Sequence, residues 1–192
     1  MKKLMIGFMV LVMCSIVLIS TEENPFDSFM GMKWGINAAE FKANFKYKVR
    51  SYSEGFVLDN FPLGSLVIKS IGFTFINIGP VKNMKFKEKN YSQFSFSKVF
   101  MLTTPDQFES LLEIFTKKYG KPIKSKDSKI QNRMGAEFSQ SIVYWENGER
   151  AISLYRYGNT IDKGFAVFAS AVEIRESIDK DKEENEKAAD IL

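Results

Sequence analysis

The segment YSQFSFSKVFML, residues 91–102, alternates phenylalanine with serine over its first half. Phe94 and Phe96 share one parity, and Ser95 and Ser97 share the other. Because successive side chains of a strand point to opposite faces, this alternation predicts a strand with one face on a core and one in water. Half-buried strands of this kind are typical of antiparallel sheets.

Other runs of the chain also have a strand-like pattern. They are KYKVRSYS (46–53), GFVLDNFPLG (55–64), SLVIKSIGFTFINI (65–78), EFSQSIVYW (137–145), RAISLYRYG (150–158) and GFAVFASAVEI (164–174). Asn147 and Gly148 lie between two of them and predict a hairpin. The polar stretch 124–136 is expected to be a loop. We therefore expect about three strands in each half of the chain.

The stretch GMKWGINAAEFKANF, residues 31–45, predicts a short helix over 38–46. Asn37 is a favourable N-cap, and Glu40 follows at the capping-box spacing. Gly35 supplies a flexible joint before the cap. Trp34 is interpreted as a packing residue under this helix, and the alternative is that it stacks on a ligand.

A second helix is predicted between Thr104 and Gly120. Thr104 is the cap, Pro105 takes the first helical position, and Gly120 ends the helix. One continuous apolar stripe runs along it, formed by Phe108, Leu111, Leu112, Phe115 and Tyr119.

This order of elements predicts an α+β fold, with an antiparallel sheet of about six strands packed by two short helices. The grouping also suggests an α-β-β-β unit that occurs twice. We expect a signal segment over 1–20, a linker over 21–30, a single domain over 31–174 and a charged tail over 175–192.

The N-terminus has the pattern of a secretory signal peptide. Lys2 and Lys3 precede an uncharged apolar run from Leu4 to Ile19, and polar, acidic sequence follows at once. A helix of this run would span roughly 24 Å, which is short of the roughly 30 Å hydrocarbon core of a bilayer. The pattern predicts an exported protein, periplasmic or secreted.

Three fates of this segment stay open. Cleavage after Ser20 would release a mature chain that starts at Thr21. The sequence LVMC, residues 11–14, is similar to a lipoprotein box and would make Cys14 a lipidation site, although Met13 is bulkier than such boxes favour. An uncleaved segment 4–19 would anchor the chain in the membrane.

The residue inventory restricts the chemistry that the chain can perform. There is no histidine, and Cys14 is the one cysteine. Histidine-based triads, histidine-ligated zinc and thiol catalysis after signal removal are therefore excluded. We expect no enzyme activity, no catalytic residue, no metal and no cofactor; a hydrolase that uses carboxylates is the remaining enzymatic alternative.

The segment 82–89 is rich in lysine and is a candidate contact with an anionic surface. It holds Lys82, Lys85, Lys87 and Lys89 around Phe86. Basic residues with an interleaved aromatic suit lipid head groups or an anionic polysaccharide, whereas lysines beside a sheet edge also serve to prevent strand pairing. The formal net charge of +4 includes Lys2 and Lys3, so nucleic acid is not an expected partner.

The motifs MKWGINAAEFKANF, FTKKYGKP, IVYW and RAISLYRYG together resemble a group of small bacterial exported proteins of unknown function. The resemblance covers about residues 29–174. The layout is also similar to the modules of bacterial envelope assembly lipoproteins and of the β-lactamase-inhibitor protein. It implies a helix-plus-antiparallel-sheet module that binds an envelope protein or has a structural role, without active-site residues, and in which Trp34 and Gly35 are architectural.

Overall fold

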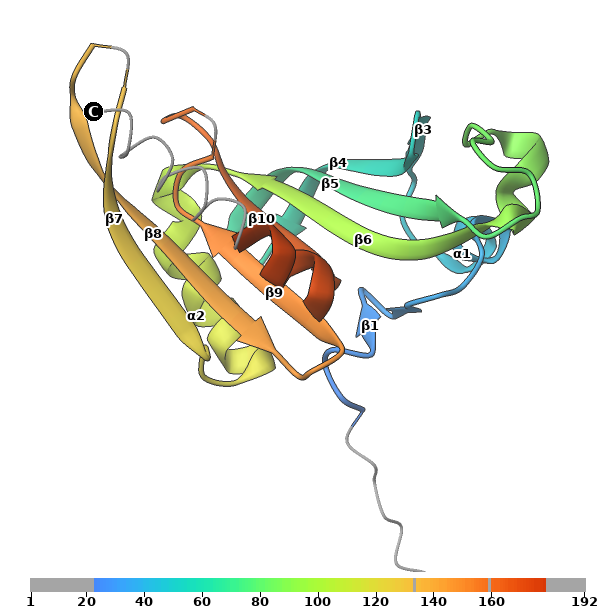
Figure 1. Cartoon of the computed structure of the whole chain (residues 1–192), viewed down its shortest axis with the longest axis horizontal. Helices are drawn as coiled ribbons and strands as arrows, with labels where there is room; N and C mark the ends of the chain where they lie inside the picture. The colour runs from blue at the N-terminus through green and yellow to red at the C-terminus, as the bar shows by residue number, and fades with distance from the viewer. Residues whose placement is uncertain (1–22, 133, 159, 179–192) are drawn as a thin grey trace, which may run out of the picture.

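The computed structural model describes residues 23–132, 134–158 and 160–178. Its main sheet is antiparallel and has eight strands in the order β3-β4-β5-β6-β10-β9-β8-β7 (Figure 1). The strands are β3 (Arg50–Tyr52), β4 (Gly55–Leu63), β5 (Leu66–Asn77), β6 (Phe94–Thr103), β7 (Lys124–Gln131), β8 (Glu137–Glu146), β9 (Arg150–Tyr155) and β10 (Gly164–Ser170).

The α+β class is confirmed, but the expected number of strands is too low. One of the additional strands is β7, which occupies most of the stretch 124–136 that we expected to be a loop. It pairs with β8 along its whole length, from Lys124 opposite Tyr144 to Gln131 opposite Glu137. Its side chains are mostly exposed because it forms an edge of the sheet, so it lacks the apolar alternation from which strands are predicted.

Both predicted helices are present, and their capping residues lie where the sequence places them. Helix α1 (Ala38–Asn44) begins after Asn37, whose Oδ1 accepts a hydrogen bond from the Glu40 amide at 2.8 Å. Pro105 opens a short 3₁₀ turn, η2 (Pro105–Gln107), that leads into α2 (Phe108–Tyr119). The Thr104 amide donates to Gln107 Oε1 at 3.2 Å.

The segment 21–30, expected to be a linker, is part of the folded domain from Phe26 onward. Phe26 and Phe29 are buried, and Phe29 packs edge-on against Phe168 with ring centroids 4.7 Å apart. A small hairpin formed by β1 (Ser28–Phe29) and β2 (Met32–Lys33) presents Phe29 to the core. Two isolated aromatic residues in a polar context carry no periodicity, which is why the sequence did not predict their burial.

The main sheet consists of two topologically equivalent units. The first contains α1 and strands β3 to β6, and the second contains α2 and strands β7 to β10. The suggested repeat is therefore present with four strands in each unit rather than three. The units join where β6 pairs with β10, from Thr103 opposite Gly164 to Val99 opposite Phe168.

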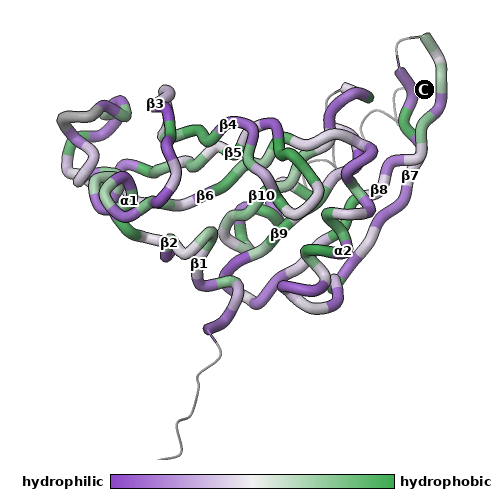
Figure 2. The backbone as a smooth tube through the Cα atoms, turned by 180° about the vertical axis from the view of Figure 1, so that it is seen from behind, coloured by the Kyte–Doolittle hydropathy of each residue, from purple (hydrophilic) through white to green (hydrophobic). Residues whose placement is uncertain are grey.

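Both α1 and α2 lie on the same face of the sheet, the near face in Figure 2. A continuous apolar core fills the space between this face and the helices and crosses the junction of the two units. It includes Phe41 of α1, Leu111 of α2 and Trp145 of β8, all nearly inaccessible to solvent.

A short helical segment at residues 171–178 lies on the opposite face, over the second unit (Figure 1). Ala171 and Ile174 are buried there against Tyr144, Ala151 and Ala169. The strand expected over 164–174 therefore ends at Ser170. The tail expected from residue 175 continues this helix to residue 178, and the rest of it lies outside the described residues.

No helix in the described part of the chain combines the length and the apolar character that a membrane span requires. The signal segment 1–20 and Cys14 lie outside the described residues.

Candidate functional site

The face of the main sheet opposite α1 and α2 is partly uncovered, and we call it the open face. It carries two clefts, of about 750 Å³ and about 470 Å³. Lys98 and Glu173 line both clefts, so their ion pair, with 2.5 Å between Nζ and Oε1, separates them. Residues that line the first cleft include Tyr52, Ser70, Gly72, Thr74, Ser95, Ser97, Lys98, Phe100, Arg150 and Glu173.

A β-bulge in β6 shapes the floor of the first cleft. Thr74 of β5 pairs with Lys98, and the next residue, Phe75, pairs with Phe96, so Ser97 has no partner in β5. The bulge shifts the alternation of β6, and for that reason both Ser97 and Lys98 line the cleft. Bulges commonly re-aim side chains next to functional sites.

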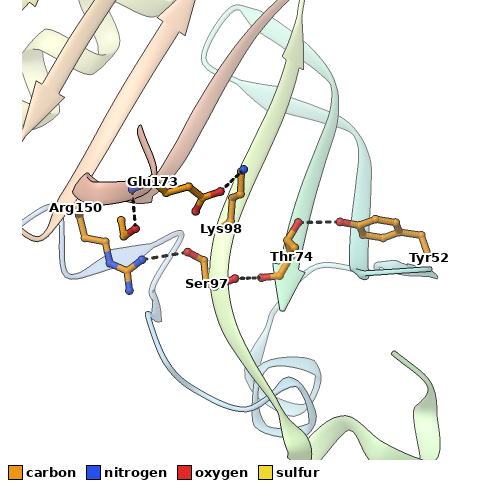
Figure 3. A network of polar contacts seen from close by, with 7 residues as sticks. Tyr52, Thr74, Ser97, Lys98, Arg150 and Glu173 are labelled. Atoms are coloured by element: carbon orange, nitrogen blue, oxygen red, sulfur yellow. Dashed lines mark hydrogen bonds and ion pairs between the residues drawn. The ribbon is translucent and has the colours of Figure 1, made fainter. Parts of the chain in front are cut away.

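Polar contacts run across the floor from β3 to the helical segment at residues 171–178 (Figure 3). The Tyr52 hydroxyl lies 3.0 Å from Thr74 Oγ1, and Ser97 Oγ donates to the Thr74 carbonyl oxygen at 3.2 Å. The Glu173 amide donates to Ser170 Oγ at 3.2 Å. The cleft is thus lined by oriented hydroxyl groups, and burial raises the pKa of the Tyr52 hydroxyl.

Arg150, at the start of β9, closes one side of the first cleft. Its Nη1 donates to the Ser97 carbonyl oxygen at 3.1 Å, and its guanidinium lies 4.5 Å from the centre of the Trp34 ring. Trp34 in turn stacks on Phe96 with ring centroids 4.6 Å apart. Burial lowers the pKa of Arg150, while the charges of Glu149 and Glu173 act in the opposite direction.

These contacts place Trp34 within the architecture of the fold. Its indole Nε1 donates to the Phe26 carbonyl oxygen at 2.7 Å. The Gly35 amide donates to the Phe96 carbonyl oxygen at 2.9 Å, which attaches the start of α1 to β6. Gly35 has φ +86°, a conformation that residues with a side chain rarely adopt.

A row of stacked aromatic rings crosses the open face at the junction of the units. Tyr155 of β9 stacks on Phe165 of β10 with centroids 4.2 Å apart, and Phe165 stacks on Phe100 of β6 at 5.3 Å. Phe100 is 40% exposed. We call these three residues the aromatic row; they join the second cleft, which Tyr155 and Phe165 line, to the first, which Phe100 lines.

The rim of the first cleft carries an exposed ion pair. Arg50 Nε lies 2.6 Å from Asp59 Oδ2. The hydrogen bond from Arg50 lowers the pKa of Asp59, and the hydrogen bond to Asp59 raises the pKa of Arg50. With Lys98 and Arg150, the cleft has three cations, against the carboxylates of Glu54 and Glu173 in its lining.

The groups of the open face are suited to binding. Within residues 23–132, 134–158 and 160–178, no group of three or more His, Cys, Asp or Glu side chains could hold a metal ion. The Ser97 hydroxyl donates to a backbone carbonyl, so it is not poised against a side-chain base. Flat aromatic surface, hydroxyl groups and paired charges together match a partner through stacking and hydrogen bonds.

The lysine-rich segment 82–89 lies at the far end of the first unit. Three of its lysines are exposed, as a surface contact requires, but its aromatic residue is buried. Lys82, Lys85 and Lys87 are exposed. Phe86 is buried and stacks on Tyr91 and Phe75, with centroids 4.8 and 5.5 Å away. Phe86 therefore belongs to the core and is not part of a surface contact. The side chain of Lys89 is not among those that the structure describes.

Gly120 and the hairpin residues Asn147 and Gly148 lie away from the clefts and have structural roles. Gly120 has φ +83°, and its carbonyl oxygen accepts a hydrogen bond from the indole of Trp145 at 2.9 Å. Asn147 Oδ1 accepts from the Arg150 amide at 2.8 Å, and Gly148 has φ +97°.

Sequence reasoning missed the residues of the open face. Tyr52, Lys98, Phe100 and Glu173 come from elements far apart in the chain, so no local motif includes them. After Phe96, the buried positions of β6 continue at Val99 and Met101, a slip of one residue that marks the bulge. The sequence does not reveal this slip, because residues 99–102 are all apolar.

Comparisons with models of protein families and with curated proteins find no match to this chain.

Proposed function

We propose that the protein is a non-enzymatic binding module of a bacterial envelope and that it binds a partner protein on its open face. The observation that carries the proposal is the aromatic row between the two clefts. Phe100 is a large apolar side chain, 40% exposed, in the middle of an eight-stranded sheet. Exposed aromatic surface surrounded by polar groups is typical of protein-binding sites.

The geometry of the open face also supports a protein partner. The row runs from the second cleft, which Tyr155 and Phe165 line, to the first, which Phe100 lines. A partner segment along the row would reach the hydroxyl groups of the first cleft and Tyr157 of the second. Aromatic anchors within a polar rim are the usual anatomy of an interface. The resemblance to envelope assembly and inhibitor modules, which bind other proteins, is consistent with this use.

The residue inventory supports a binding role over catalysis. The chain has no histidine, and its cysteine lies in the proposed signal segment. In the described residues, Glu173 and Asp59 both form ion pairs with cations. A carboxylate-based hydrolase would need two acidic groups that face a common substrate, and the first cleft offers Glu54 and Glu173 from different elements, the latter already paired.

Photo-crosslinking in the native host tests the proposal directly. A photoreactive phenylalanine analogue replaces Phe100, and a matched control carries it at Glu113, an exposed position of α2 on the other face. We expect one protein adduct, identified by mass spectrometry, from position 100 and none from position 113. The adduct should be lost when Phe165→Ala is added. Equal adducts at both positions, or none at position 100, would overturn the proposal.

The proposed location rests on the N-terminal sequence and needs a separate measurement. The intact mass of the native protein, taken from membrane and from freely diffusing fractions, distinguishes the three fates of residues 1–20. A chain that starts at Thr21 would identify a periplasmic or secreted protein, and acyl mass on Cys14 would identify a lipoprotein. A full-length chain in the diffusing fraction would contradict export.

A further inference from the structure

We infer that the end of the first unit is a contact site for an anionic lipid surface, formed by Ile76, Ile78 and Val81 together with Lys82, Lys85 and Lys87. We call these six residues the end patch. Ile76 also lines the first cleft, so the end patch adjoins the open face. The lipid contact is tested separately from protein binding there.

The apolar part of the end patch is unusually exposed. Ile76, Ile78 and Val81 are 56%, 62% and 54% exposed, whereas Phe73 and Phe75 of β5 are buried. They lie within six consecutive positions at the end of β5 and in the loop that follows it. A cluster of exposed β-branched residues at one end of a domain is unfavourable in water, and a partner that covers it relieves this cost.

Positively charged residues directly follow these apolar residues in the chain. Lys82, Lys85 and Lys87 are exposed in the same loop. Lys42 of α1 adds a further positive charge at this end, because its Nζ lies 5.2 Å from the centre of the Tyr91 ring in η1 (Glu88–Gln93). Aliphatic side chains next to lysines match a bilayer surface, where the former enter the acyl boundary and the latter contact phosphate groups.

The backbone of the end patch is held in place by the fold. Asn77 fixes its start: its Nδ2 donates to the Val81 carbonyl oxygen at 2.7 Å, and its Oδ1 accepts from the Gly79 amide at 2.8 Å. Asn90 fixes its end, donating to the Lys85 carbonyl oxygen at 2.8 Å. Between Asn77 and Asn90, the buried ring of Phe86 anchors the loop in the core. The exposed side chains are therefore presented on a built loop, which lowers the ordering cost of binding.

The test uses the full chain with Cys14→Ser, so that a single introduced cysteine carries an environment-sensitive fluorophore. One protein carries it at Ile78→Cys. The matched control carries it at Ile123→Cys, an isoleucine of similar exposure, 65%, beside β7 at the other end of the sheet. Each is mixed with vesicles of phosphatidylcholine, with and without phosphatidylglycerol. Because the readout is local, attachment through residues 4–19 affects both proteins equally.

We expect a blue shift at position 78 that requires phosphatidylglycerol and weakens with salt, and no shift at position 123. Each Lys→Gln change among Lys82, Lys85 and Lys87 should raise the lipid concentration that gives half of the full shift by about fivefold. The same number of changes at Lys117, Lys121 and Lys124 should have little effect. A shift of equal size at both positions, no shift at position 78, or a shift unaffected by the Lys→Gln changes in the end patch would overturn the inference.

Discussion

At the scale of single residues, Trp34 shows how one side chain holds three segments together. Its ring lies between Phe96 and the guanidinium of Arg150, and its indole donates to the Phe26 carbonyl oxygen. The N-terminal segment, β6 and β9 are therefore joined through one residue. Stacking on a ligand, the alternative role for Trp34, would require a ring face that Phe96 and Arg150 leave uncovered.

Replacing Trp34 by alanine should destabilise the protein by about 3 kcal/mol, because the change removes packing, the cation–π contact and a hydrogen bond. Trp34→Phe keeps a ring between Phe96 and Arg150 and should lose only about 1 kcal/mol. Urea unfolding followed by circular dichroism measures both. If Trp34→Ala were as stable as the parent protein, the residue would have no structural role and a ligand-binding role would regain support.

Tyr119 makes stability depend on pH in the alkaline range. Its ring packs on Phe26, Phe115 and Phe168, and burial raises its pKa well above the ordinary value of 10.0. The unfolded phenol therefore ionises at lower pH than the folded one. Its contribution to stability is fully present below pH 10 and is lost as the pH rises from there toward the folded pKa.

Comparison with Tyr119→Phe isolates this contribution. Above about pH 10 the unfolding free energy of the parent protein should fall more steeply than that of the variant, by up to about 1.4 kcal/mol per pH unit. Denaturant titrations at several alkaline pH values measure the two slopes. Identical slopes would show that Tyr119 ionises with the same pKa in both states.

At the scale of elements, the end of α2 depends on a backbone conformation reserved for glycine. Gly120 has φ +83° and ψ −169°, and its carbonyl oxygen accepts the Trp145 indole. Gly120→Ala should lower the free energy of unfolding by about 1–3 kcal/mol.

Gly72→Ala is the matched control, since an added Cβ would lie at ordinary contact distance, 3.7 Å, from the Phe100 carbonyl oxygen. There the change should be neutral or stabilising by up to about 1 kcal/mol. Thermal unfolding of the two variants checks the difference, and equal losses would contradict it.

The exposed edge of β7 is protected from pairing by lysine. Lys124 and Lys126 lie on this terminal strand of the sheet and are exposed. Replacing both by valine should promote edge-to-edge association, because lysine on an edge discourages the addition of another strand. Light scattering and gel filtration measure the association. The same two substitutions at Lys117 and Lys121, which lie on and after α2, control for added hydrophobicity, and association of the control to the same extent would refute a role of the edge.

Elements with strong local signals could be predicted from the sequence, and those defined by tertiary contacts could not. Asn37, Pro105 and Gly120 act within one or two turns of chain, so their effect is local. Phe86 looked like an exposed aromatic among lysines because its burial depends on Phe75 and Tyr91. The open face could not be predicted either, since it needs the strand order and the bulge at Ser97.

At the scale of the whole molecule, the continuous core makes the two units depend on each other. Phe41 of the first unit and Trp145 of the second belong to one buried cluster. Phe41→Ala should therefore lower the stability of both units together, by about 3–5 kcal/mol. In a Trp34→Phe background the fluorescence reports Trp145 alone, so its unfolding midpoint should move with Phe41→Ala and coincide with that from circular dichroism. A Trp145 transition unaffected by Phe41→Ala would mean that the units unfold separately.

The pairing of β6 with β10 has a consequence for how copies of this chain can combine. Each unit is one continuous stretch of sequence, and the chain passes between them once, through Thr104 and Pro105. If that passage straightens, β6 of one copy can pair with β10 of another, and both open faces are rebuilt from exchanged halves. Two molecules can thus exchange units and keep the strand pairing of the whole sheet.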